Sequence, residues 1–230
     1  MTRADVCVVA CAEAWRGDGA ILASFAGLIP HLGARLAQRT FSPELLVTDG
    51  EATLLRDDQV EGWLPYRAVF TMVAAGTRHV MMGAGQLDRF GNQNISCVGD
   101  WSRPKSQLLG VRGAPGNTVN HTTSYWVPRH SPRVFVEHVD MVSGVGHDRG
   151  AHEIRVVVTN LAVLDFATPD RSMRLRSTHP GVTVDEVLAA TGFSLTVPDE
   201  VPHTREATPE ERSLLREHLD PDGLREKEVR

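Results

Sequence analysis

The chain has 230 residues, of which 41% are hydrophobic and 23% charged, and its formal net charge at pH 7 is −5. This composition is ordinary for a globular protein that is large enough to bury a substantial core. The acidic balance argues against a sequence-independent nucleic-acid surface, which needs clustered Lys and Arg. Three cysteines without a CxxC motif favour reduced thiols and a cytoplasmic location, and the apolar N-terminal stretch is too short to span a membrane.

The first half of the sequence predicts alternating strands and helices. Residues 5–11 are apolar and β-branched, which is typical of a strand buried on both faces. Residues 19–39 carry apolar side chains at helical spacing, with Pro30 and Gly33 indicating a break. The alternation of predicted strands and helices predicts a parallel sheet with right-handed crossovers. The elements that follow are a strand at 44–48, a helix at 66–76 and a buried strand at 78–85.

The second half predicts additional antiparallel strands. Residues 153–160 and 161–167 indicate a hairpin that turns at Thr159 and Asn160. The expected fold class is therefore α/β, an open and mostly parallel sheet with helices and with antiparallel additions in the C-terminal half. We expect a single domain over residues 1–230. The other strands are expected at 133–142 and 173–178.

Two helices in this half carry clear start signals. Thr183 is followed three residues later by Glu186, and Thr208 by Glu211, so both pairs match a capping box. Gly192 is placed to end the first of these helices. The expected ranges are 182–192 and 208–219, followed by a charged, frayed tail over about 220–230.

Residues 110–132 form a long stretch rich in Gly, Pro, Asn and Thr, and such stretches inside a compact domain are usually functional. Its glycines either form a backbone nest for an anion or oxyanion or belong to a flexible loop. The histidines and cysteines match no common metal-ligand spacing, so we expect no metal site. Cys97 is expected to be a small buried hydrophobe.

Two turns follow predicted strands and are candidates for chemistry. In LLVTDGEAT (45–53), Thr48 is followed by two carboxylates at a strand end where α/β proteins collect ligands, although Asp-Gly is also an ordinary turn. In GAGQLDRFGNQNIS (83–96), Gly, Gln and Asn side chains suit close approach to a carbonyl or thioester. The alternative is a hairpin that turns over 88–92.

Four motifs resemble the β subunits of class I CoA-transferases, the glutaconate and 3-oxoacid CoA-transferase group. The resemblance implies that family's open α/β sandwich and a homologous α subunit as partner, often in an α2β2 heterotetramer. It also implies an acyl-CoA substrate, with no separate cofactor because CoA is part of the substrate. The motifs are GAGQLDRFGNQNIS (83–96), FVEHVDMVSGVG (135–146), TNLAVLDF (159–166) and THPGVTVDEVLAATGF (178–193).

One departure from the family pattern changes the implied chemistry. In the transferases the strand that matches 45–48 ends in Ser-Glu-Asn-Gly, and this Glu forms a thioester with CoA. Here Thr48 stands at that position, and a hydroxyl cannot form the same exchangeable anhydride and thioester. VTDGEATLL, GVRGAPGNTVNHTTSYW and DPDGLREKEVR instead resemble a branch of the family that hydrolyses a C–C bond of the last steroid ring in a CoA thioester, with the essential Glu on the α partner.

The resemblance implies that this chain supplies a wall of the site, with no catalytic residue of its own and a place in steroid or cholesterol catabolism. Gly113 and Ala114 match the paired residues of the family's GxGGA motif, whose N–H groups face the thioester. The alternatives are a true CoA-transferase β subunit with a displaced carboxylate, Asp49 or Glu51, and a non-catalytic scaffold subunit. The residues expected to bind substrate or stabilise an oxyanion are Thr48, Gln86, Asp88, Arg112, Gly113, Ala114, Asn117, Asn120 and His121.

Overall fold

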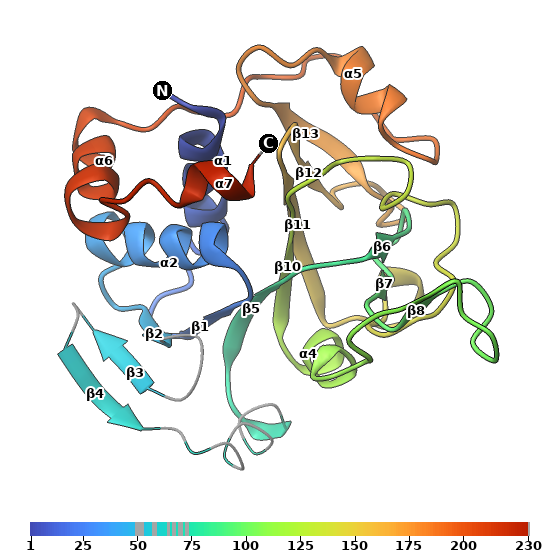
Figure 1. The fold of residues 1–230 in the computed structure, drawn as a ribbon, viewed down its shortest axis with the longest axis horizontal. Coiled ribbons are helices and arrows are strands. Elements are labelled where there is room, and N and C mark those ends of the chain that lie inside the picture. Colours follow the sequence, from blue (N-terminus) through green and yellow to red (C-terminus); the bar gives the residue numbers. More distant parts are fainter. Residues whose placement is uncertain are drawn as a thin grey trace. The chain divides into compact units, whose positions relative to one another are not determined.

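The computed structural model describes residues 1–48, 53–56, 59–63, 65, 68, 71 and 74–229 (Figure 1). Its contacts divide the chain into two compact units, Met1–Met82 with Arg205–Arg230, and Gly83–Thr204. Among the described residues, no helix has both the length and the apolar character needed to cross a membrane. The helix expected at 66–76 falls largely outside the described residues.

Among its described residues, the first unit contains three parallel strands. β1 (Leu22–Phe25) pairs in parallel with β2 (Leu46–Thr48) on one side and with β5 (Arg78–Met82) on the other. β2 and β5 match predicted strands, whereas β1 lies in a range that we expected to be helical. β3 (Thr53–Arg56) and β4 (Gln59–Trp63) extend the β2 side in antiparallel fashion. Every residue of β5 is buried, as expected for the buried strand predicted at 78–85.

The strand expected at 5–11 is instead part of a helix, α1 (Arg3–Ala14). The Thr2 hydroxyl accepts a hydrogen bond from Asp5 N, and the Asp5 carboxylate accepts one from Thr2 N, which completes a capping box. Almost all of α1 is buried, so its sequence lacks the polar face that reveals a helix by its 3.6-residue period. A continuous apolar run does not by itself distinguish a buried strand from a buried helix.

The range expected to be helical at 19–39 divides into β1 and α2 (Leu28–Thr40), and neither Pro30 nor Gly33 breaks the helix. Pro30 lies in the first turn, where the missing N–H has no helical partner to lose. A Cβ added to Gly33 would lie 2.7 Å from Cys11 Cβ. Gly33 therefore allows α1 and α2 to pack closely.

The C-terminal segment returns to the first unit. α6 (Pro209–Leu214) begins with the predicted capping box of Thr208 and Glu211, and the chain continues in a π-helical turn, Leu215–Leu219. The tail that we expected to be frayed forms a further short helix, α7 (Arg225–Glu228).

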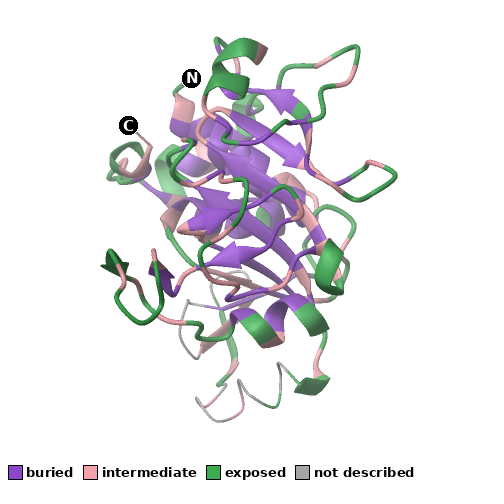
Figure 2. Ribbon diagram, turned by 90° about the vertical axis from the view of Figure 1, so that its right-hand side faces the viewer, coloured by how far each residue is buried: buried purple, intermediate pink, exposed green. Residues whose placement is uncertain are grey.

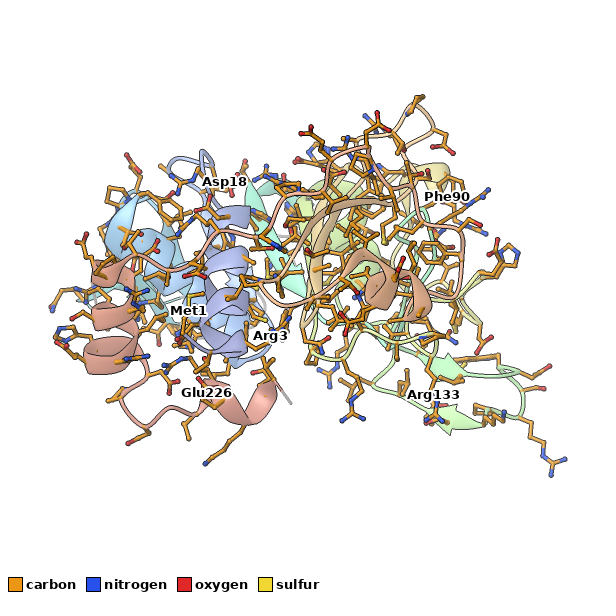
Figure 3. All side chains as sticks on the ribbon, turned by 90° about the horizontal axis from the view of Figure 1, so that it is seen from above. Met1, Arg3, Asp18, Phe90, Arg133 and Glu226 are labelled. Atoms are coloured by element: carbon orange, nitrogen blue, oxygen red, sulfur yellow. The ribbon has the colours of Figure 1, made fainter. Side chains whose placement is uncertain are left out.

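Charged contacts fix this tail in place. The buried guanidinium of Arg225 donates to Asp5 Oδ1 and to Asp220 Oδ2, at 2.8 Å in each case. The Thr2 hydroxyl donates to Glu226 Oε1 at 2.6 Å, and Figure 3 shows Glu226 close to the start of α1. The prediction of a frayed tail is wrong because a high density of charge in the sequence does not reveal that two of the charged residues, Asp220 and Arg225, are buried and paired.

The second unit is built on a mixed sheet whose strands are largely buried (Figure 2). β10 (Thr122–Val127) pairs in parallel with β11 (Glu153–Thr159). β12 (Ala162–Asp165) is antiparallel to β11, and β13 (Arg174–Thr178) is antiparallel to β12. The hairpin and the strand predicted for 153–178 are therefore confirmed. β10 was not predicted, because it lies within the stretch at 110–132 that we interpreted as irregular.

Two further predictions for this unit need correction. Residues 133–142 form no strand, and only Phe135 makes an isolated bridge, with Leu87. α5 (Val184–Ala189) has the predicted capping box but ends before Gly192. Gly192 N–H donates to Phe135 O at 2.8 Å, and a Cβ there would collide with the same carbonyl oxygen. Gly192 is thus required for close backbone contact and does not cap the helix.

Candidate functional site

The motif at 83–96 forms a hairpin of β6 (Gln86–Leu87) and β7 (Gln93–Asn94). Asp88 Oδ1 accepts hydrogen bonds from the backbone N–H groups of Phe90 and Asn92, both at 3.0 Å. Burial raises the pKa of Asp88, and the hydrogen bonds from Asn92 and Phe90 offset only part of this rise. The Asp88 carboxylate therefore holds the turn of the hairpin.

Asn92 connects this turn to a second segment of the unit. Its Nδ2 donates to Asp88 Oδ2 and to Asp148 Oδ1, both at 2.9 Å. Its Oδ1 accepts from Gly146 N at 2.7 Å. Asn92 is almost fully buried, so these bonds satisfy a polar group that would otherwise destabilise the fold.

Gln86 connects three segments through its side-chain amide. Its Oε1 accepts from Asn94 Nδ2 at 2.7 Å and from Asp140 N at 3.0 Å, while its Nε2 donates to Asp140 Oδ2 at 3.0 Å. Asp140 Oδ2 also accepts from Gly99 N at 2.8 Å. Both polar atoms of the Gln86 amide are thus bonded within the unit, so its clearest role is to position the backbone around it.

Replacing Asp88 by Asn should lower the free energy of unfolding by about 1–3 kcal/mol, because one of three donors loses its acceptor inside the protein. Chemical denaturation of the purified protein measures this difference. Asp185, an exposed residue in the first turn of α5, provides the control, and Asp185→Asn should change stability by about 0.5 kcal/mol or less. A normal stability for Asp88→Asn would show that the hairpin does not depend on the carboxylate.

The Gly-rich stretch contains α4 (Ala114–Asn120). Gly113 is exposed at its N-cap with φ −83°, and Arg112 before it is exposed with a positive φ of 47°. Ala114 N donates to Val111 O at 3.0 Å. In this conformation the Ala114 N–H already has a partner, so of the two N–H groups predicted to face a thioester only that of Gly113 is a candidate.

The other predicted residues on and after α4 differ in exposure. Asn117 and His121 are buried, with 6% and 2% of their surfaces exposed. Asn120 is exposed, and its Nδ2 donates to Gly116 O at 2.9 Å within the helix. Of these three residues, only Asn120 is exposed at the surface, whereas Asn117 and His121 are buried.

The segment at 142–146, whose role sequence reasoning did not identify, fixes the position of α4. The Thr118 hydroxyl donates to Ala114 O at 3.0 Å and accepts from Val145 N at 3.1 Å. A Cβ on Gly144 would lie 2.9 Å from both Gln93 Oε1 and Thr118 Cγ2. Gly144 therefore lets this segment pass between α4 and the hairpin. The sequence signal was the pair of glycines in VSGVG, which we used only as part of a family motif.

Thr48 is the last residue of β2 and is buried, with 7% of its surface exposed. It belongs to the first compact unit, whereas the other eight predicted site residues belong to the second. The neighbouring carboxylates of the opening motif, Asp49 and Glu51, lie outside the described residues.

The three cysteines, Cys7, Cys11 and Cys97, are buried and free, as expected for Cys97 from its sequence context. Burial raises the pKa of the Cys7 and Cys11 thiols, which keeps them protonated and unreactive. Within the described part of the chain, no group of three or more His, Cys, Asp or Glu side chains is arranged to hold a metal ion.

Comparison with known proteins gives consistent matches. The family described as Coenzyme A transferase matches residues 67–190. The cholesterol ring-cleaving hydrolase IpdB subunit of Rhodococcus jostii (strain RHA1) is 49% identical over 244 residues, which cover 100% of this chain and 96% of that protein. The crystal structure of R. jostii RHA1 IpdAB matches with a TM-score of 0.96 and 49% identity, covering 100% of this chain and 99% of the other.

Glutaconate coenzyme A-transferase from Acidaminococcus fermentans matches with a TM-score of 0.81 at 23% identity, covering 96% of each chain, which shows the fold alone. The predicted fold class is confirmed.

Proposed function

Because this chain belongs to the coenzyme A transferase family, we propose that it is the β subunit of a heteromeric hydrolase that acts on a CoA thioester in cholesterol catabolism. The reaction is hydrolytic C–C cleavage that opens the last steroid ring. The observation that carries this proposal is the 49% identity to a cholesterol ring-cleaving hydrolase subunit over the full length of the chain. The TM-score of 0.96 to IpdAB supports it.

The proposed division of labour places the catalytic glutamate on a homologous α subunit. By the resemblance of its sequence to the family pattern, Thr48 stands where the transferases carry their nucleophile, and its hydroxyl is a poor substitute for a carboxylate in acyl exchange. A general base on the partner would activate water, and backbone N–H groups near Gly113 would stabilise the developing oxyanion. We propose an α2β2 assembly in the cytoplasm. The subunit names of the relatives support a partner subunit, and the three free, buried thiols fit a reducing compartment.

Product analysis of the co-expressed subunits tests the function directly. The complex should convert a steroid-derived CoA thioester with an intact last ring into a ring-opened acid that has gained one water, without any acceptor acid. The chain alone should be inactive. Turnover that requires an acceptor carboxylate and transfers CoA to it would support the transferase instead, and full turnover by the isolated chain would exclude the need for a partner.

Thr48→Ala in the complex should lower the rate by about tenfold or less. The change removes at most one hydrogen bond, worth roughly 0.5–1.5 kcal/mol, whereas loss of a nucleophile lowers kcat by several orders of magnitude. Steady-state kinetics with the CoA thioester measures the effect. Asp49→Asn, made in parallel, probes the alternative of a displaced carboxylate. Loss of all turnover in either folded variant would place the catalytic group on this chain.

A further inference from the structure

The strands β8 (Cys97–Val98) and β9 (Ser106–Gln107) form a hairpin whose tip carries an unusual group of exposed side chains. Trp101 exposes 63% of its surface, and Arg103 and Lys105 beside it are exposed as well. Lys105 is one of only two lysines in a chain with a net charge of −5. Figure 1 shows the chain extending beyond β8 as a long loop at the edge of the second unit.

The tip is ordered even though its side chains face solvent. Asp100 Oδ1 accepts from Ser102 N at 2.7 Å, and Arg103 N donates to Asp100 O at 3.1 Å. Gly99, at φ +87°, begins the turn and donates its N–H to Asp140 Oδ2 at 2.8 Å. Asp140 is in turn bonded to Gln86 at 3.0 Å. The ring and the two cations are therefore presented on a backbone that is tied to the hairpin of the candidate site.

An apolar segment leads from this tip to α4. Leu109 and Val111 expose 73% and 39% of their surfaces. The backbone on both sides of Leu109 is held in place, because Leu108 N donates to Ser96 O at 2.8 Å and Gly110 N donates to Ile95 O at 3.1 Å. Along the chain, an aromatic ring with two cations is thus followed by exposed apolar side chains and then by the start of α4 at Gly113.

We propose that residues 99–113 bind the CoA part of the substrate, from its nucleotide end to its thioester, an inference that rests on the proposed function. Trp101 stacks on the adenine ring, since base–aromatic stacking is a common and strong contact. Arg103 and Lys105 bind the phosphates of the nucleotide. Leu109 and Val111 contact the pantetheine arm, which leaves the thioester near Gly113.

Lys105 favours a nucleotide over a protein as the occupant of this tip. Lysine is depleted in protein–protein interfaces, whereas phosphates attract both Lys and Arg. The order of the side chains also follows the order of chemical groups in a CoA ester, which carries its phosphates and base at one end and its acyl thioester at the other.

The test compares two substrates on the assembled enzyme, the CoA thioester and the same acyl group on pantetheine, which lacks the nucleotide. Trp101→Ala should raise KM for the CoA thioester about tenfold, within the range of stacking contributions, and leave kcat nearly unchanged. The kinetics of the pantetheine thioester should not change. Trp63→Ala, at a residue of β4 with a similar exposure of 72%, should leave both substrates unaffected.

A second variant isolates the phosphates. Arg103→Gln with Lys105→Gln should raise KM for the CoA thioester and weaken its dependence on salt, because fewer charge contacts remain to be screened. Titration of the wild-type complex with adenosine 3′,5′-bisphosphate should show binding that the variant loses.

Two results would overturn the proposal. The first is a KM for the CoA thioester that is the same in the Trp101 and Arg103/Lys105 variants as in the wild-type complex. The second is dissociation of the complex by Trp101→Ala in size-exclusion chromatography, which would identify the tip as a subunit contact. Neither would affect the proposed function, which is tested separately by whether the wild-type complex hydrolyses the CoA thioester without an acceptor acid.

Discussion

Arg225→Ala is expected to lower the free energy of unfolding by about 3–5 kcal/mol, because it leaves two buried carboxylates without their cation. Arg225, Asp5 and Asp220 expose only 4%, 1% and 4% of their surfaces. The guanidinium also donates to Asp220 O at 3.2 Å, so its removal affects the backbone that leads into α7. Chemical denaturation at neutral pH measures the loss.

Arg216 provides the matched control. Its guanidinium lies 3.9 Å from Asp5 Oδ2, but 57% of its side chain is exposed. Exposed pairs contribute about 1 kcal/mol or less, so Arg216→Ala should be nearly neutral. Equal effects of the two substitutions would show that burial of the pair does not determine its contribution.

The same ion pair predicts a dependence on pH. Burial by itself would raise the pKa of Asp220, but hydrogen bonds from Arg225 and from Leu224 N–H outweigh it and lower the pKa. A lowered folded-state pKa means that the contribution to stability is complete above the unfolded value of about 3.9 and is lost as the pH falls through the folded value. The stability difference between wild type and Arg225→Ala should therefore narrow below about pH 4.

The local signals in the sequence predicted those elements whose cause is local. The capping boxes at Thr183 and Thr208 place both helix starts correctly, since each depends on a residue three positions away. The hairpin of β11 and β12 follows in the same way from adjacent strands and a short turn. The strand at 44–48 and the buried strand at 78–85 are also confirmed, as β2 and β5.

The predictions that failed depend on contacts distant in sequence. α1 lacks a polar face because it is buried almost all round, partly against α2 through the close approach of Cys11 to Gly33. The tail is held by Arg225 and Asp5, which are 220 positions apart. β10 reads as a loop because its sequence, TTSYWV, follows a run of Gly, Pro and Asn, and its pairing with β11 supplies the order that local composition does not indicate.

In the candidate site too, the sequence predicts which residues matter, whereas their distant contacts appear only in the structure. The family motif located Gln86, Asp88 and Asn92, but only the structure shows that Gln86 bonds to Asp140 and that Asn92 bonds to Asp148 and Gly146. These partners lie more than fifty positions away in the sequence. The contacts of Gln86 and Asp88 hold the backbone, so their proposed influence on substrate is through the position of the segments that they connect.

Gly113→Val in the assembled enzyme should lower kcat/KM by about 10²-fold or more, the loss that follows removal or displacement of one oxyanion donor. Gly113 is exposed, and its φ is negative at −83°, so valine needs no left-handed backbone there and the fold should survive. The added Cβ would lie 3.3 Å from Asn117 Nδ2 and would cover the surface where the thioester is expected. Kinetics with the CoA thioester and thermal unfolding of the same sample separate activity from stability.

Val119→Ala controls for a general disturbance of α4, because Val119 lies on the same helix, is 48% exposed and has no proposed contact with substrate. It should retain activity. The kcat/KM of Gly113→Ala should lie between those of Val119→Ala and Gly113→Val, since its single methyl group approaches Asn117 but covers less of the surface. Gly113→Val should lower kcat/KM for a pantetheine thioester as strongly as for the CoA thioester, because the reacting carbonyl is common to both. Normal turnover by a well-folded Gly113→Val enzyme would exclude the start of α4 as the oxyanion site and would place the required N–H donors elsewhere, on the partner or on another loop.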